Sequence, residues 1–382
     1  MSARPPRVLV LNAGSSSMKL SVVTARGAVT DSWDIDVWDG SADDPELRGY
    51  LGRLAGGRDR RPDAIGHRVV HGGSTFTSAV LVDDDVRAGI AALTPLAPLH
   101  QPRALAGIAA AAAAFPGLPQ VACFDTAFHA TMPARASTYA LPAGWRERFG
   151  LRKFGFHGLS HSYAARRAAE LAPPADPAGF KVVTCHLGAG ASLAAVHGGR
   201  SVDTTMGFTP VDGLVMATRC GSVDPGLVAW LAAEDKVGLA DLSRGLEHGS
   251  GLAGLASLPD GNGDIRAVEA AAEAGDQAAA LALAVHAHRL IAGIASMAAA
   301  MNGLDALAFT GGIGEHDAKV RAAAAAGLRF LGVRLDDRRN AGAHADADIS
   351  ADGARVRTVV VTAREDLEIA RGVAGVLPGI AS

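Results

Sequence analysis

The chain has 382 residues, of which 49% are hydrophobic and 20% charged, and its formal net charge is -3. Because a single hydrophobic core stops growing near about 250 residues, this length predicts two domains. Both charge signs are interleaved, without a basic stripe or an acidic tail. Nucleic acid and membrane surfaces are therefore not expected as partners.

The first residues, MSARPPRVLVLNAG, contain too short an aliphatic run for a secretory signal. The apolar run at residues 104–115 is mostly alanine and is shorter than the roughly 20 residues that cross a bilayer. Cys123, Cys185 and Cys220 are odd in number and far apart, which fits neither a disulfide framework nor a zinc cluster. These features predict a cytoplasmic protein with reduced thiols.

Short aliphatic strands alternate with long alanine-rich helical stretches along the chain. Strands are expected at residues 8–11, 181–185 and 305–309, and a long helix at residues 277–301. This alternation predicts an α/β fold.

Two segments in different halves of the chain share one design, which indicates an internal repeat. In the first, strand 8–11 leads through the turn NAGSSS into a second strand; in the second, strand 181–185 does so through HLGAGAS. Glycines let the backbone approach an anion, and the Ser15, Ser17 and Ser192 hydroxyls can donate to phosphate oxygens. Two unrelated glycine-rich hairpin turns are the alternative.

Arg68 in GHRVVHGG and Arg219 in ATRCGSVDPG stand beside glycines in strand-like or loop contexts. A planar guanidinium can bind a carboxylate or phosphoryl oxygens through two parallel hydrogen bonds. Either residue could instead be an ordinary surface arginine.

Histidines recur four residues apart at His67 and His71 and again at His157 and His161, a spacing that on a helix could bind zinc. The first pair brackets a strand-like stretch, where such positions lie about 13 Å apart. His157 precedes Gly158 at a predicted helix start. We expect His157 to donate a hydrogen bond to an anion, with a structural histidine as the alternative.

Two acidic residues are expected just beyond strands. Asp125 follows an aliphatic strand, where α/β proteins place functional side chains, although a helix N-cap would look the same. Glu365 follows the β-branched stretch 358–362, and its carboxylate could hold Mg²⁺ through water or cap a helix.

A third glycine-rich turn, TGGIGEH at residues 310–316, lies between a predicted strand and an alanine-rich helix. A helix start offers free N–H groups and a positive dipole end, which favours nucleotide binding, although a tight structural turn is equally consistent. The chain lacks the P-loop pattern GxxxxGK[ST].

Together these segments resemble the acetate kinase family, and through it the superfamily of sugar kinases, heat-shock chaperone ATPases and actin. The similarity covers essentially the whole chain. The blocks that carry it, in family order, are NAGSSSMK, GHRVVHGG, APLHQP, CFDTAFH, FGFHGLSH, CHLGAGAS, DTTMGFTPVDGLVMATRCG and FTGGIGEH. The resemblance implies two similar α/β domains, each a mixed sheet with flanking helices, around a nucleotide cleft. Residues 1–129 plus 367–382 would form the N-terminal domain and residues 130–366 the C-terminal nucleotide-binding domain.

The resemblance also implies an activity. The enzyme would transfer the ATP γ-phosphoryl group reversibly and in line to acetate or propionate, with Mg²⁺ or alternatively Mn²⁺, and would form a homodimer. Two alternatives stay open: a kinase for a longer acid such as butyrate, and a non-catalytic ATP-dependent switch of the same superfamily. In a switch Arg68 and Arg219 would be dispensable, because it binds no carboxylate.

The residue roles follow from the matching positions. The catalytic residues would be Arg68, Asp125, His157 and Arg219. Arg68 would bind the substrate carboxylate, and the acyl pocket would be Val70, Leu99, Phe156 and Pro210. Asn12 and Glu365 would place the metal. The nucleotide and its phosphates would contact Lys19, Ser15, Ser17, His186, Leu187, Gly188, Ala189, Gly190, Asp264, Ile265, Arg266, Gly312, Ile313, Gly314, Glu315 and His316.

A carboxylic acid is already ionised at neutral pH, so its attack on phosphorus needs no general base. Asp125 is therefore expected to orient Arg68 or a metal-bound water. The chain departs from the family pattern, which has asparagine at Ala189, His316 and Arg364 and glycine at Ala217. These changes spare the catalytic residues and concern nucleotide affinity and phosphoryl-donor preference.

Overall fold

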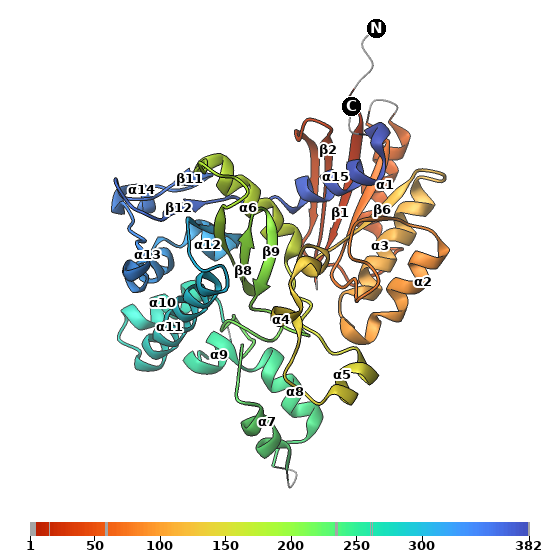
Figure 1. Ribbon diagram of the computed structural model, residues 1–382. Coiled ribbons are helices and arrows are strands. Elements are labelled where there is room, and N and C mark those ends of the chain that lie inside the picture. The colour runs from red at the N-terminus through yellow and green to blue at the C-terminus, as the bar shows by residue number, and fades with distance from the viewer. Residues whose placement is uncertain are drawn as a thin grey trace. The chain divides into compact units, whose positions relative to one another are not determined.

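The computed structural model describes residues 5–14, 16–57, 60–233, 236–259, 261 and 263–380 (Figure 1). The chain divides into two compact units. The first comprises Met1–Ala130, Phe156–Tyr163 and Arg364–Ser382, and the second comprises Thr131–Gly155 and Ala164–Ala363. The domain limits implied by the resemblance stay a prediction.

A six-stranded mixed sheet forms the centre of the first unit. Its strands are β1 (Arg7–Ala13), β2 (Met18–Thr24), β3 (Val29–Ile35), β4 (Ala64–Val69), β5 (Val80–Leu81) and β6 (Gln120–Phe124). The order is β3-β2-β1-β4-β6-β5. Strands β1, β4 and β6 are parallel, whereas β2, β3 and β5 are antiparallel to their neighbours.

The second unit contains a sheet of the same design. Its strands are β7 (Lys181–Leu187), β8 (Ala191–His197), β9 (Arg200–Thr204), β10 (Ala306–Thr310), β11 (Ala347–Asp348) and β12 (Arg357–Val360). The order is β11-β12-β10-β7-β8-β9, which is the first order with each strand replaced by its counterpart. Strand directions also correspond, and each sheet shifts register between its second and third strands. The predicted α/β fold and internal repeat are thereby confirmed.

Helices cover both faces of the first sheet (Figure 1). They are α1 (Pro45–Gly56), α2 (Asp84–Ala92), α3 (Gln101–Ala114), the start of α6 (Gly158–Leu171) and α15 (Glu365–Val376). Because side chains alternate along β1, Leu9 and Leu11 enter the core that contains α1 and α3, whereas Val8 and Val10 enter the core that contains α15. Gly66 on β4 allows this close packing, since a Cβ there would lie 2.6 Å from Ile369.

The second unit has more helices. They are α4 (Ala134–Ser137), α5 (Ala143–Phe149), α7 (Pro225–Ala232), α8 (Leu239–His248), α9 (Gly251–Ala256), α10 (Ile265–Glu273), α11 (Gln277–Ala300), α12 (Gly311–His316), α13 (Ala318–Gly327) and α14 (Asp337–Ala341). Asp276 caps α11 by accepting from the backbone of Ala278 and Ala279. Among the described residues, α11 alone is long and apolar enough to cross a membrane. A core helix of a soluble protein meets the same criterion, and α11 packs on β7, β8, α9, α10 and α13.

One local prediction differs from the structure. Residues 310–316 were expected as a turn, but Gly311–His316 form the short helix α12. Gly311 enters it with a φ of 77°, and a Cβ there would lie 2.7 Å from the Leu187 carbonyl oxygen. Arg321 then closes the helix by donating to the carbonyls of Gly314 and Glu315 at 2.9 and 2.8 Å.

Candidate active site

Three predicted residues of the first unit meet at one edge of its sheet. Asn12 lies near the end of β1, Arg68 near the end of β4, and Asp125 directly after β6. These strands are parallel neighbours, so their carboxyl ends share an edge. The topology thus brings together side chains that are far apart in sequence.

Arg68 and Asp125 form a buried ion pair. The Arg68 Nη2 and Nε atoms donate to Asp125 Oδ2 at 2.7 and 3.1 Å, and Nε also lies 3.3 Å from Oδ1. The side chains are 15% and 1% exposed. Burial raises the pKa of Asp125, which Arg68 opposes. Burial alone would lower the pKa of Arg68, but Asp125 and Glu365 outweigh it and raise this pKa.

Asn12 links the same arginine to Glu365. Arg68 Nη1 donates to Asn12 Oδ1 at 3.3 Å, and Asn12 Nδ2 donates to Glu365 Oε2 at 2.7 Å. Glu365 is the first residue of α15, and its Oε2 lies 4.0 Å from Arg68 Nε. Hydrogen bonds therefore join Asn12 and Glu365, the two residues predicted to place the metal, to Arg68.

His157 lies in a turn with unusual backbone geometry. Its φ is 55°, a left-handed conformation that is costly for residues other than glycine. Gly158 follows and begins α6, and a Cβ there would lie 1.9 Å from the Asp125 carbonyl oxygen. The close packing of Gly158 on Asp125 fixes this turn beside the ion pair.

The other histidines of the first unit have structural contacts. His67 Nε2 lies 2.6 Å from Gln120 Oε1, and burial lowers the pKa of His67 to about 4. His71 Nδ1 accepts from the Gly73 backbone, and burial lowers its pKa to about 4 as well. Within the described residues no three His, Cys, Asp or Glu side chains form a metal-binding group. That these histidine pairs do not bind zinc stays a prediction.

His129 was not predicted as a site residue, yet it contacts the same turn. Its Nε2 lies 3.0 Å from the carbonyl oxygen of Phe156, and its ring lies 5.6 Å from that of His161. The residue belongs to the CFDTAFH block, but its spacing alone gave no indication of this contact. His129 thus helps hold the residue that precedes His157.

The predicted acyl-pocket residues are divided between the units. Phe156 and Val70 are buried in the first unit, at 1% and 6% exposure, whereas Leu99 is 52% exposed. The Phe156 ring meets the His71 ring edge-on at 5.4 Å. Pro210 belongs to the second unit, where its carbonyl accepts from Arg219.

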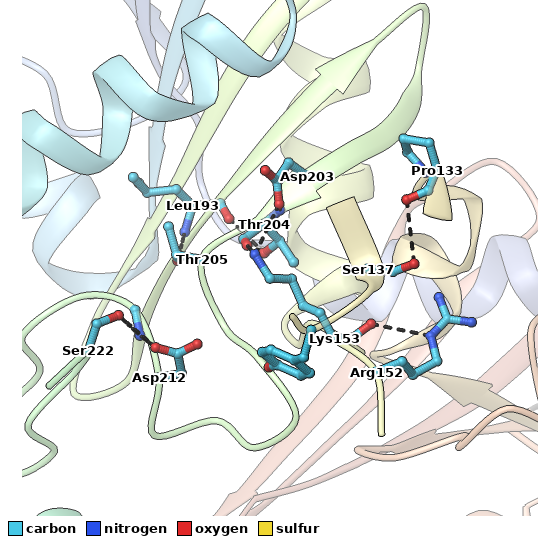
Figure 2. Close-up of polar contacts among 12 residues, drawn as sticks. Pro133, Ser137, Arg152, Lys153, Leu193, Asp203, Thr204, Thr205, Asp212 and Ser222 are labelled. Carbon is cyan, nitrogen blue, oxygen red and sulfur yellow. Dashed lines mark hydrogen bonds and ion pairs between the residues drawn. The ribbon is translucent and has the colours of Figure 1, made fainter. Parts of the chain in front are cut away.

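Arg219 is held in a loop of the second unit. Its Nη1 donates to the Pro210 carbonyl at 3.3 Å, and no ion pair to a described acidic residue forms. Burial lowers the pKa of Arg219, with an opposing effect from Glu247. In the same loop, Ser222 Oγ donates to Asp212 Oδ1 at 2.6 Å (Figure 2). This contact closes the loop around a half-buried cation that has no carboxylate partner among the described residues.

Lys153 contacts strand β9 of the same unit. Figure 2 shows its Nζ reaching Asp203 Oδ1 at 3.1 Å and the Thr204 carbonyl at 2.8 Å. Sequence reasoning did not single out Lys153 or Asp203. Neither belongs to a glycine-rich turn, and their pairing depends on tertiary structure.

A cavity of about 840 Å³ lies in the second unit. Its predicted lining residues are Gly188, Ala189, Asp264, Ile265, Arg266, Gly312, Ile313 and His316. Three separate segments thus meet around one space large enough for a nucleotide. His186, Leu187, Gly190, Gly314 and Glu315 do not line it, and the Glu315 carboxylate instead accepts from the Ala363 backbone.

Further lining residues were not predicted. They are Ala217, Thr218, Gly261, Gly263, Glu269, Asp317, Ala318 and Lys319. Several directly continue the predicted segments: Gly263 precedes Asp264, and Asp317 follows His316 and caps α13. Extending each predicted nucleotide segment by three residues would have found all of them except Ala217 and Thr218.

The predicted phosphate turn of the first unit is described only in part. Ser15 lies outside the described residues. The Gly14 N–H donates to the Ser17 carbonyl at 2.8 Å, which closes the β1–β2 hairpin. Lys19 is exposed on β2, in register with Asn12.

The model of the acetokinase family matches residues 58–371. An acetate kinase of Synechococcus sp. (strain JA-2-3B'a(2-13)) is 44% identical over 409 residues, covering 97% of this chain and 99% of the relative. An acetate kinase of Deinococcus deserti is 45% identical, covering 95% and 96%.

Solved structures agree with the sequence matches. The acetate kinase of Porphyromonas gingivalis superimposes with a TM-score of 0.86 at 32% identity, covering 97% of this chain and 100% of that one. A propionate kinase from Francisella tularensis superimposes with a TM-score of 0.87 at 35% identity, with the same coverage. The chain therefore belongs to the acetokinase family.

Proposed function

We propose that the protein transfers the γ-phosphoryl group of ATP reversibly to a short-chain carboxylate, acetate or propionate, and so forms an acyl phosphate. The proposal rests on the way Arg68 is held. Asp125 and Asn12 occupy N–H groups on Nε, Nη2 and Nη1. A guanidinium has five N–H groups, so one remains on each Nη atom. Two N–H groups on neighbouring Nη atoms can donate to the two oxygens of a carboxylate.

Arg219 supplies the second cation. A half-buried guanidinium without a carboxylate partner among the described residues favours binding an anion, and the transferring phosphoryl group is one. In phosphoryl transfer a single arginine contributes on the order of 10³ to 10⁵ in rate, because it neutralises charge on the equatorial oxygens. His157 has a related role as a hydrogen-bond donor to the same oxygens.

Asn12 and Glu365 fit a divalent metal, Mg²⁺ or alternatively Mn²⁺. Their amide and carboxylate oxygens are the ligand types that hard cations prefer, and Glu365 is 15% exposed, which leaves access for water. Two protein ligands suit Mg²⁺, which usually keeps several waters and substrate phosphates. Such a metal neutralises charge on the phosphates of the nucleotide.

Asp125 orients Arg68 and transfers no proton. Both of its oxygens face the Arg68 guanidinium, and its side chain is 1% exposed. The substrate carboxylate is already ionised at neutral pH, so no proton needs to leave the attacking oxygen.

The large cavity of the second unit is the proposed nucleotide site. It combines apolar surface at Ile265 and Ile313 with the Asp264 and Arg266 side chains and the imidazole of His316. Apolar surface with a few polar groups suits a purine and a ribose. ATP in this cavity is the phosphoryl donor.

A homodimer in the cytoplasm is also part of the proposal. Apolar side chains are exposed on α5 and α7 of the second unit, among them Trp145 (57%), Phe149 (57%) and Trp230 (58%). Large exposed aromatic residues are enriched at protein interfaces. Sedimentation equilibrium of the wild type and of Trp230→Ser tests this: a monomeric wild type would contradict it.

The activity is tested by incubating the purified protein with ATP, MgCl₂ and acetate, propionate or butyrate in turn, and trapping acyl phosphate with hydroxylamine. Hydroxamate is expected with acetate or propionate and only in the presence of a divalent metal. MnCl₂ in parallel tests the alternative metal. Absence of hydroxamate with every acid, or ADP formation that does not depend on the acid, would refute the proposal.

A further inference from the structure

A second, smaller cavity of about 370 Å³ lies in the second unit, between α10, α11 and α13. Its walls are mostly apolar, with Leu283, Ala287 and Leu290 on α11 and Ala272 on α10. This volume is at the lower end of the range for small-molecule sites and suits a molecule of one or two rings.

His286 lines this cavity and is 5% exposed. Its imidazole makes no hydrogen bond or ion pair with any residue that the structure describes. It lies on the buried stripe of α11 between Ala282 and Leu290, where an apolar side chain would be expected. His286 is not among the fully enclosed side chains with an unpartnered polar atom, so its ring nitrogens stay accessible from the cavity, where a ligand can form a hydrogen bond to them.

The charges at the rim restrict what can bind. Lys319 Nζ lies 2.6 Å from Glu273 Oε1 and 3.4 Å from Glu269 Oε2, so two carboxylates face one ammonium. The negative balance disfavours an anionic ligand. Burial lowers the pKa of His286 below its ordinary value, so the imidazole is neutral and offers one donor and one acceptor nitrogen.

We propose that this cavity binds a small uncharged molecule with an apolar body and one hydroxyl group, such as a phenol, which hydrogen-bonds to His286. Glu269 and Lys319 line both this cavity and the larger one described above. A ligand that fixes these two side chains therefore changes the affinity of the larger cavity for its nucleotide. This coupling, unlike the binding itself, rests on the proposed nucleotide role of the larger cavity.

The binding is tested by ¹⁹F NMR titration of the full-length protein with 4-fluorophenol and, separately, fluorobenzene. Saturable binding of 4-fluorophenol is expected. The wild type should prefer 4-fluorophenol over fluorobenzene, and this preference in affinity should fall about tenfold in His286→Leu. A tenfold loss corresponds to roughly one hydrogen bond. Ala287→Leu should abolish binding of both probes by filling the cavity, whereas Ala284→Leu, an exposed position on the same helix, should leave it unchanged.

Lack of saturable binding to the wild type, unchanged binding to Ala287→Leu or an unchanged ratio in His286→Leu would each overturn the site. Coupling is measured as the Kd for ATP with and without saturating 4-fluorophenol. A change of about fivefold or more is expected, with ATP changing the Kd of 4-fluorophenol by the same factor. Equal ATP affinities would overturn the coupling. If ATP does not bind at all, the proposed function fails, while the fluorophenol titration still decides the site.

Discussion

Arg68 and Asp125 face each other so that two guanidinium nitrogens donate to one carboxylate, at 2.7 and 3.1 Å to Oδ2. Asp125 is 1% exposed, and Asn12 accepts from the third nitrogen of Arg68. The guanidinium is thereby fixed in orientation, and one N–H group on each Nη atom remains for the substrate carboxylate that we propose. We therefore propose that Asp125 is a positioning residue, and the effects of replacing it can be measured.

Asp125→Asn should lower kcat/KM for the carboxylate by about 10²-fold or more, because Arg68 loses its orientation. Removing one partner of a buried ion pair should also destabilise the fold by about 3 to 5 kcal/mol. The pH dependence of kcat/KM should keep its shape. Steady-state kinetics across pH and urea unfolding measure both effects. Full activity, or loss of one limb of the pH profile, would contradict the positioning role.

The two arginines should respond differently to replacement by lysine. Arg68→Lys should mainly raise the KM for acetate, because one ammonium cannot match both carboxylate oxygens. Arg219→Lys should mainly lower kcat, by about 10³-fold, since its interaction strengthens in the transition state. Equal changes in KM and kcat for the two variants would show that the assigned roles are wrong.

Gly158 should tolerate no side chain. In Gly158→Ala the Cβ would lie 1.9 Å from the Asp125 carbonyl oxygen, so the turn that carries His157 must move, and kcat should fall sharply. Gly245→Ala is the matched control, because Gly245 lies in helix α8 with no atom within 4 Å of the added Cβ. The control should gain roughly 0.5 to 1 kcal/mol of stability and keep its activity. Similar kinetics for both variants would remove the argument for a fixed turn.

Buried neutral histidines should make the fold sensitive to acid. The pKa of His67 is about 4 in the folded chain against an ordinary value of 6.5, because burial disfavours its charged form. Between these values the unfolded chain binds a proton that the folded chain does not, so stability falls as pH decreases from 6.5 to about 4. One such histidine contributes a slope of about 1.4 kcal/mol per pH unit.

His67→Gln keeps a hydrogen-bond donor for Gln120 and removes the titrating group. The slope of unfolding free energy against pH, measured by urea denaturation, should therefore decrease by about 1.4 kcal/mol per pH unit in this window, which corresponds to one proton. A variant slope equal to that of the wild type would mean that His67 is protonated in the folded state.

Local patterns were enough to predict the strands that carry the site. The hydrophobic stretches at β1, β7 and β10 and the glycine-rich turns after β1 and β7 indicated where the duplicated sheets begin. Asp125 could be predicted because it directly follows β6, at the sheet edge where α/β proteins place functional groups.

Contacts between distant segments could not be read in this way. The bond from His129 to the Phe156 carbonyl and the pairing of Lys153 with Asp203 depend on how the strands are ordered. The glycine-rich sequence at residues 310–316 also did not distinguish a turn from the short helix α12. Gly311 adopts the left-handed backbone conformation at which this helix begins. Glu315 lies in this helix, and its carboxylate accepts a hydrogen bond from the Ala363 backbone instead of lining the cavity.

The central claim is direct transfer of one phosphoryl group between ATP and a carboxylate held by Arg68. Its most direct test is the configuration at phosphorus after turnover with ATP made chiral at the γ-phosphorus by oxygen isotopes, and with acetate as the acceptor. A single in-line displacement predicts inversion in the acetyl phosphate. Retention would require a phosphorylated intermediate of the protein and would contradict the account.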